Sequence, residues 1–377
     1  MKTKKMAALL LSGAMLASVL SGCGSVDKDA VVATLDGEEI KLGVANFAAR
    51  LTQANLDDIY AAYFGDDVWS TDLYSSGSTT QESVKTNVIS DIKEMYILKN
   101  HMDDYNVSLS DEETSEIADV AAQFIADNTQ EALDQLGATE DIVEEYLTLY
   151  TIKTKMETAI KADADTDVSD EEANERGYSY VKIDTEGYTD DDSNYVEYTD
   201  DEKAELETTA QTLAEACQDD FDGAITDAGY TVSTGTYAAD DESLDEEVVT
   251  ALDALSEGEV SDLVTTDSAY YILRLDTECD EEATETHRQE IIDDRQTELY
   301  DEVYGGWEDD ADWNLDEDVW ATVEFKDLFT TKVEDTETEE PAEATESVNE
   351  TEAVSETEET NATESVNETE AVEATEE

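Results

Sequence analysis

Apolar residues recur at two different periods along this chain, and the change of period limits the folds that it can adopt. From about residue 43 to 162 they recur at helical spacing, as Val88 and Ile92 do, which predicts helices packed through apolar stripes. From Tyr178 the period becomes that of strands, and helical spacing returns over 281–304. The sequence therefore predicts a mostly helical region, then a smaller α+β unit of strands and helices, and then a return to helical structure.

The smaller unit is expected to run strand, helix, turn, helix, strand, strand, with an acidic loop after the first strand. Its helix starts are marked by a Ser or Thr followed three residues later by Glu, which is the spacing of a capping box. The expected elements are a strand over Tyr178–Ile183, helices opened at Thr199 and Ser243, and strands over Val260–Val264 and Tyr270–Leu275. This order is typical of an α+β domain.

The two ends of the folded region carry further local signals. Val31–Leu35 is a β-branched run closed by Asp36-Gly37, which predicts a hairpin turn before the first helix. Ser110 opens another capping box. Near the other end, a strand is expected over Val319–Phe325. Beyond it, Val333–Glu377 contains no Lys or Arg and repeats a Glu- and Thr-rich motif, so this tail is expected to be disordered.

The first residues have the pattern of an export signal. Three lysines, Lys2, Lys4 and Lys5, precede the uncharged apolar stretch Met6–Leu20, which is too short for a permanent membrane helix. The stretch ends in Leu-Ser-Gly-Cys at Cys23 and resembles the bacterial lipobox. The resemblance implies that Cys23 receives a lipid and that residues 1–22 are removed. The chain would then be lipid-anchored at the extracytoplasmic face of the cell membrane.

Charge and composition exclude several classes of partner. The chain has 101 acidic and 20 basic side chains and a net charge of −81 at pH 7. Nucleic acid is excluded as a partner, because phosphate groups are bound by clustered Lys and Arg. The same negative field repels anionic lipids, so the acyl chain is expected to be what holds the body near the membrane.

The residues that usually hold metals or carry nucleophilic catalysis are sparse. The only histidines, His101 and His287, have no Cys or His near them in the sequence, so a zinc site or a histidine-based triad is not expected. Neither a metal nor another cofactor is expected. Besides Cys23 the chain has Cys217 and Cys279, and both a disulfide and two free thiols stay open.

Taken in order, these elements resemble the extracytoplasmic parvulin-type foldases, both the PrsA-like lipoproteins of Gram-positive bacteria and the SurA-like chaperones. The resemblance covers about residues 30–330. In the smaller unit it is carried by a motif in two parts. The first part is an apolar helix that ends in a Leu shortly before a Gly, and the Gly is followed in order by an acidic residue, an apolar residue and Ser. The second part is a closing strand. These segments are Ala251–Ser261 and Ala269–Leu275, and the matching front segments are Val32–Ile40 and Val107–Glu113.

The resemblance implies an α+β fold in which a mostly helical SurA-like chaperone module is completed by the C-terminal segment and interrupted by a parvulin-like domain. The expected parts are a signal peptide at 1–22, the N-terminal helical module at 23–175, the parvulin-like peptidyl-prolyl isomerase domain at 176–279, a helix and strand returning to the module at 280–332, and the disordered acidic tail at 333–377.

The resemblance also indicates where a cleft would lie. Parvulins have two histidines facing each other across the cleft, and on this chain those positions fall at Tyr180 and Tyr271. Tyr237 is a candidate for the aromatic wall. A phenol can donate and accept a hydrogen bond, so isomerase activity could persist, be weak or be lost.

The leading hypothesis is a membrane-anchored folding factor whose partners are unfolded or partly folded secreted polypeptides. Its oligomeric state stays open. Two alternatives share the export signal: a solute-binding lipoprotein of a transporter and an acidic structural lipoprotein of the surface. The first would need repeated strand–helix alternation, which residues 43–162 lack, and the second rests on the acidic tail alone.

Overall fold

The computed structural model describes residues 15–17, 26–73, 75–189, 194–238, 241, 243–325 and 328–331. The expected lipidation site Cys23 and the tail at 333–377 lie outside the described residues. Among the residues that are described, no helix is both long and apolar enough to cross a membrane.

A three-stranded antiparallel sheet joins the two ends of the helical module. Strands β2 (Val31–Leu35) and β3 (Glu38–Lys41) form the expected hairpin. Asp36 and Gly37 have φ of 52° and 85°, the positive values that a two-residue hairpin turn needs. On its other edge β2 pairs with β10 (Trp313–Leu315), so residues from the far end of the chain complete this sheet.

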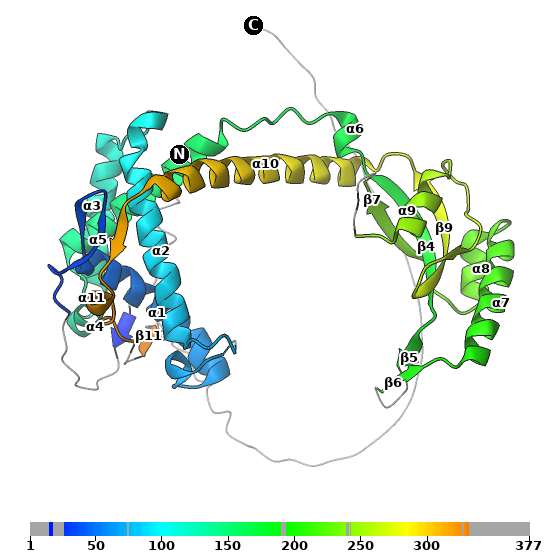
Figure 1. Ribbon diagram of the computed structural model, residues 1–377, viewed down its shortest axis with the longest axis horizontal. Helices are drawn as coiled ribbons and strands as arrows, with labels where there is room; N and C mark the ends of the chain where they lie inside the picture. The colour runs from blue at the N-terminus through cyan, green and yellow to red at the C-terminus, as the bar shows by residue number, and fades with distance from the viewer. Residues whose placement is uncertain are drawn as a thin grey trace, which may run out of the picture. The chain divides into compact units, whose positions relative to one another are not determined.

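Helices make up the rest of the N-terminal module (Figure 1). Thr79 and Ser110 each make both hydrogen bonds of a capping box, which confirms the helix start expected at Ser110. The helices are α1 (Leu42–Phe64), α2 (Thr80–Asn100), α3 (Asp111–Asp127), α4 (Gln130–Leu136) and α5 (Glu140–Lys161), with short 3-10 turns at Val68–Ser70 and Met102–Tyr105.

The C-terminal segment returns to the helical module, as expected. The long helix α10 (Glu281–Asp310) packs Tyr300, Val303 and Trp307 against α2 and α5. At the other end of α10 the short helix α6 (Asp170–Ala173) lies beside it.

The prediction of a strand over Val319–Phe325 is wrong. Asp316 accepts a hydrogen bond from the backbone N–H of Val319 and so begins a helical turn, α11 (Glu317–Trp320). The strands form on either side of that segment. They are β10 and β11 (Phe329–Thr331), and β11 pairs antiparallel with β1 (Met15–Ala17), which lies inside the expected signal peptide.

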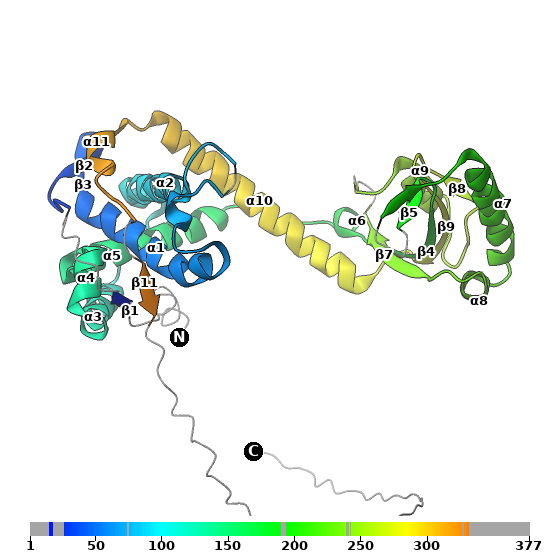
Figure 2. The ribbon, with the colours of Figure 1, turned by 90° about the horizontal axis from the view of Figure 1, so that it is seen from below.

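The inserted domain is a four-stranded antiparallel sheet with helices on both faces. Its strands are β4 (Arg176–Asp184), β7 (Ser233–Tyr237), β8 (Val264–Thr265) and β9 (Ala269–Thr277), in the order β7-β4-β9-β8. Helices α7 (Asp200–Cys217) and α8 (Phe221–Asp227) cover one face and α9 (Glu246–Asp253) covers the other (Figures 1 and 2).

Three sequence-based expectations for this domain need correction. The acidic loop contains a hairpin, β5 (Gly187–Thr189) with β6 (Tyr195–Glu197). The helix expected from Ser243 begins only at Glu246, where Asp245 is the N-cap residue. Of the strand expected over Val260–Val264, only Val264 lies in a strand, while Val260 forms a single bridge to Arg274. The edge strand β7 was not expected, because Ser-Thr-Gly-Thr has no apolar alternation.

The architecture is therefore α+β, with the sheet domain inserted between two parts of a helical module, which confirms the expected fold class. The open question about the cysteines is answered for this structure. Cys217 is buried, Cys279 is exposed, and both are free thiols.

Candidate peptide-binding cleft

Two neighbouring strands bring the candidate tyrosines Tyr180 and Tyr271 together. In the antiparallel pairing of β4 with β9, Tyr180 lies opposite Leu273 and Lys182 lies opposite Tyr271. Because side chains alternate across a strand, all four residues face the same side of the sheet. The rings of Tyr180 and Tyr271 are 6.2 Å apart between centroids and tilted by 43°.

These two rings end a continuous row of four tyrosines. Tyr237 meets Tyr178 edge to face at 5.8 Å, and Tyr178 lies 5.5 Å from Tyr180. Tyr237 and Tyr178 are buried under Val248 and Leu252 of α9, whereas Tyr180 and Tyr271 are only partly buried. The tyrosine row, Tyr237, Tyr178, Tyr180 and Tyr271, therefore runs from the domain core to an open face of the sheet.

Tyr237, the candidate aromatic wall, is the fully buried end of the row. Its hydroxyl accepts a hydrogen bond from Arg176 Nη1 at 2.6 Å and donates one to Asp253 Oδ1 at 3.2 Å. Arg176 also donates to the backbone oxygen of Leu255 at 3.1 Å. Tyr237 thus ties the first strand of the domain to α9 and anchors the row rather than facing a ligand.

Gly235 in β7 makes room for the ring of Tyr178, which lies opposite it in the sheet. A Cβ atom at Gly235 would come within 2.9 Å of Cζ and of the hydroxyl oxygen of Tyr178. Strand parity in the sequence places Tyr178 on the same face as Tyr180, but Tyr178 was not named as a cleft candidate. That alternation was the signal that could have identified it.

The phenols of the row are neutral hydrogen-bonding groups. Burial raises the pKa of Tyr178 to about 12. Burial also raises the pKa of Tyr271, although the nearby ammonium group of Lys182 acts in the opposite direction. Lys182 is itself paired with Asp184 at 2.8 Å. The open face therefore offers hydroxyl groups that donate and accept at neutral pH, beside one cation.

The two histidines lie away from this face. His101 stacks on Trp307, with ring centroids 4.1 Å apart. His287 lies on α10, where its Nδ1 is 3.4 Å from Glu175 Oε1 and 3.2 Å from the backbone oxygen of Ala173. The tyrosine row thus has no imidazole beside it.

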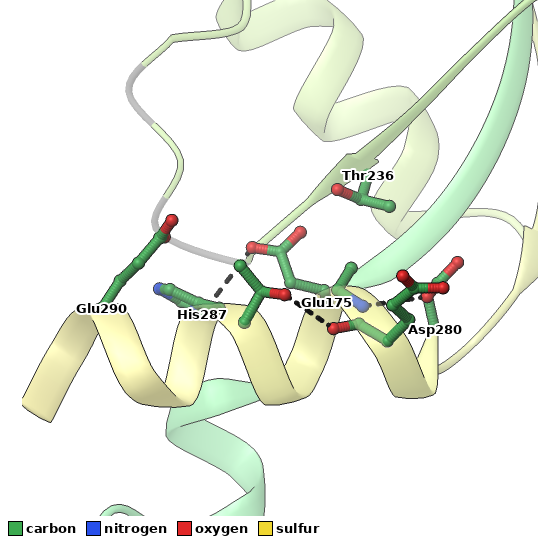
Figure 3. A pocket seen from close by; sticks show the side chains of 8 residues that line it. Glu175, Thr236, Asp280, His287 and Glu290 are labelled. Atoms are coloured by element: carbon green, nitrogen blue, oxygen red, sulfur yellow. Dashed lines mark hydrogen bonds and ion pairs between the residues drawn. The ribbon is translucent and has the colours of Figure 1, made fainter.

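Figure 3 shows the surroundings of His287, a cavity of about 410 Å³ between α10 and the start of β4. Glu175, Asp280 and Glu290 line it with Thr236 of β7. Burial raises the pKa of Glu175, and both Thr236 and His287 oppose that rise. The cavity lies where α6, the start of β4 and α10 meet, and neither Tyr180 nor Tyr271 lines it.

The fold and the tyrosine face together define an α+β domain of parvulin type. Residues 186–285 match the family model of the PPIC-type PPIase domain, so this part of the chain is a domain of that family. Tyr271 lies inside the matched range and Tyr180 lies just before it.

Solved structures of foldases and chaperones are similar to this chain at low identity. The foldase protein PrsA from Lactococcus lactis is 15% identical, with 78% of this chain and 97% of that chain covered and a TM-score of 0.32. The peptidylprolyl isomerase PrsA from Bacillus cereus is 17% identical, with 79% and 98% covered and a TM-score of 0.30. A SurA-like chaperone structure from Campylobacter jejuni is 11% identical, with 76% and 98% covered and a TM-score of 0.27.

No curated protein matches the chain. The family assignment rests on the domain match, because the structural likenesses are weak.

Proposed function

We propose that this protein is an extracytoplasmic folding factor for secreted polypeptides, and that its parvulin-like domain, at 176–279, binds client segments with little or no isomerase activity. One observation carries the proposal. The two positions expected to hold histidines, Tyr271 inside the segment that matches the PPIC-type PPIase model and Tyr180 shortly before it, hold partly buried phenols whose rings lie 6.2 Å apart.

The chemistry of prolyl isomerisation favours binding over catalysis at this face. Rotation about an X-Pro bond has a barrier of about 18–20 kcal/mol, most of it amide resonance. An isomerase needs no nucleophile, only an apolar slot and donors that favour the twisted amide over the planar one. Two phenols supply donors, but their rings, 6.2 Å apart, occupy the face of the sheet where such a slot is expected.

The test pairs two assays on the purified full chain: refolding of a proline-limited client and suppression of aggregation of a non-native client. We expect aggregation to be suppressed and proline-limited refolding to be accelerated little. Tyr180→Phe and Tyr271→Phe should leave both readouts unchanged, because each removes only a hydroxyl group. Substitution of both tyrosines by His tests whether an imidazole pair restores catalysis.

Strong acceleration that either Phe substitution abolishes would show that the phenols are catalytic donors. Failure of the unmodified protein in both assays would reject a folding function altogether.

We further propose that a lipid on Cys23 holds the protein at the extracytoplasmic face of the membrane. The support is the lipobox-like sequence before Cys23 and the apolar stretch that precedes it. Cys23→Ala should move the protein from the membrane fraction to the soluble fraction, with Cys279→Ala as the control that stays in place. A Cys23→Ala protein that stays in salt-washed membranes would contradict the anchor.

A further inference from the structure

Among the residues that the structure describes, large apolar side chains are exposed at two places, and one of them is the last two turns of α1. There Ile59 is 56%, Tyr63 80% and Phe64 54% exposed. The other place is the β5–β6 hairpin, with Tyr188 and Tyr195. Contiguous exposed apolar groups of this kind usually mark an interaction surface.

The α1 patch is defined as Ile59, Tyr60, Tyr63 and Phe64. Contacts with buried residues beneath it hold it in place. Helical spacing brings Tyr60 and Phe64 edge to face at 5.9 Å, and Tyr63 lies 6.4 Å from Phe64. Tyr60 packs on the buried Trp69 at 5.6 Å. The indole of Trp69 donates to Asp57 Oδ1 at 2.7 Å. The aromatic groups are therefore presented on a fixed base, which lowers the entropy lost on binding.

Negative charge lies beside this patch. Asp66 and Asp67 follow the C-cap residue Gly65 of α1 and are exposed. The last turn of α1 has no basic residue, so the partial negative charge of the helix C-terminus is not offset there. The patch thus combines aromatic faces with a negative rim.

Charge also selects among possible occupants of the patch. The tail at 333–377 contains no Lys or Arg, so it is repelled by the rim. A second copy is disfavoured because each chain carries a net charge of −81. An apolar segment that carries Lys or Arg satisfies both features, since cations bind aromatic faces as well as carboxylates.

We propose that the α1 patch is a docking site for cationic, apolar segments of non-native polypeptides. The proposal rests on the folding function proposed above and names the class of client segment.

The test measures binding of a fluorescent peptide of about twelve residues, rich in Lys and Leu, to the purified full chain by anisotropy. A matched peptide with Glu in place of Lys serves as the charge control. Tyr63→Ser combined with Phe64→Ser should weaken binding of the Lys peptide at least tenfold. Tyr195→Ser, which removes an aromatic group that is 61% exposed on the other domain, should change it less than twofold.

Asp66→Asn combined with Asp67→Asn should reduce the preference for the Lys peptide over the Glu peptide. The thermal midpoint of each variant is measured beside binding to show that it is folded, since all substituted side chains are exposed.

Three results would overturn the proposal: equal binding of the two peptides, equal loss from Tyr195→Ser, or a dimer that Tyr63→Ser dissociates. Aggregation suppression separates this proposal from the folding function. If the unmodified protein and the patch variant suppress aggregation of a client equally well, the docking role of the α1 patch is rejected and the folding function is not. An unmodified protein that protects no client rejects the folding function.

Discussion

The helical module and the sheet domain place polar groups in their cores in opposite ways. The module buries charged side chains, with Arg50 5% and Asp57 1% exposed, whereas the sheet domain buries neutral phenols of the tyrosine row. Burying a charge is costly unless it is paired and hydrogen-bonded. The module therefore depends on hydrogen bonds to its buried charged side chains, and the sheet domain depends on the packing of its tyrosine rings.

In the module, the buried charges hold the C-terminal segment. Asp57 Oδ2 accepts from the backbone N–H of Phe329 at 2.7 Å, and Lys85 Nζ donates to the backbone oxygens of Trp320 and Val323 at 3.0 and 2.7 Å. Arg50 Nη1 donates to the backbone oxygen of Glu324 at 2.9 Å. These side chains of α1 and α2 thus bind backbone more than 230 residues away in the sequence.

In the sheet domain, the tyrosine row is anchored at one end and open at the other. Within the part of the chain that the structure describes, Tyr237 is the member of the row that makes hydrogen bonds to charged side chains, those of Arg176 and Asp253. At the open end Tyr180 and Tyr271 are partly exposed. Fixed charges therefore join distant parts of the module, whereas the open end of the row presents phenols beside the ammonium group of Lys182.

The largest effect should come from Asp57→Ala in the module. The substitution leaves the donors of Trp69, Gln53 and Phe329 without their carboxylate acceptor, and it removes a charge that faces Arg50. Each buried donor left without its acceptor costs about 1–3 kcal/mol, so the loss of three such bonds should be the most destabilising of these changes. Urea unfolding monitored by tryptophan fluorescence measures the change.

The matched control is Asp66→Ala, an exposed carboxylate near the same helix, which should shift the unfolding free energy by less than about 0.5 kcal/mol. Equal effects of the two substitutions would mean that the buried charges do not hold the C-terminal segment.

A smaller effect is expected from Gly235→Ala in the sheet domain. The new methyl group would meet the ring of Tyr178 at 2.9 Å, and overpacking of this kind costs about 1–3 kcal/mol. Near-UV circular dichroism should also change as the ring moves. Gly305→Ala in α10 is the control, because a Cβ there meets nothing within 4 Å. A neutral Gly235→Ala would show that the tyrosine row is loosely packed.

Tyr237→Phe should cost somewhat less. It removes the hydroxyl between Arg176 and Asp253, which keep each other as partners at 3.3 Å, and a typical hydrogen bond contributes about 0.5–1.5 kcal/mol net. Thermal unfolding of the variant measures the loss, with Tyr195→Phe on the exposed hairpin as the neutral comparison. If the midpoint stays unchanged, the anchor at the closed end of the row carries no stability.

The smallest effect should come from Tyr180→Phe and Tyr271→Phe. Both hydroxyls are on the partly exposed open face, so each variant should unfold within about 0.5 kcal/mol of the unmodified protein. A loss of unfolding free energy as large as that of Tyr237→Phe would show that the hydroxyls at the open end stabilise the domain as much as the hydroxyl at the closed end.

Local signals in the sequence determined much of this protein. The hairpin at Asp36-Gly37 and the capping boxes at Ser110 and Thr199 formed as expected, because each depends on residues within one turn of chain. The alternation of apolar and polar residues likewise predicted β4 and β9. The neighbouring placement of Tyr180 and Tyr271 followed from the family resemblance and the parity of their strands.

The tertiary structure alone decided the features that depend on distant partners. Ser233–Tyr237 is a strand only because β4 offers it an edge and Tyr178 fills the space beside Gly235. The charges of Asp57 and Lys85 are buried only because backbone groups near the C-terminal end of the fold satisfy them. The residue pattern of one segment cannot predict such contacts, because these hydrogen bonds and this packing form only when a second, distant segment is in place.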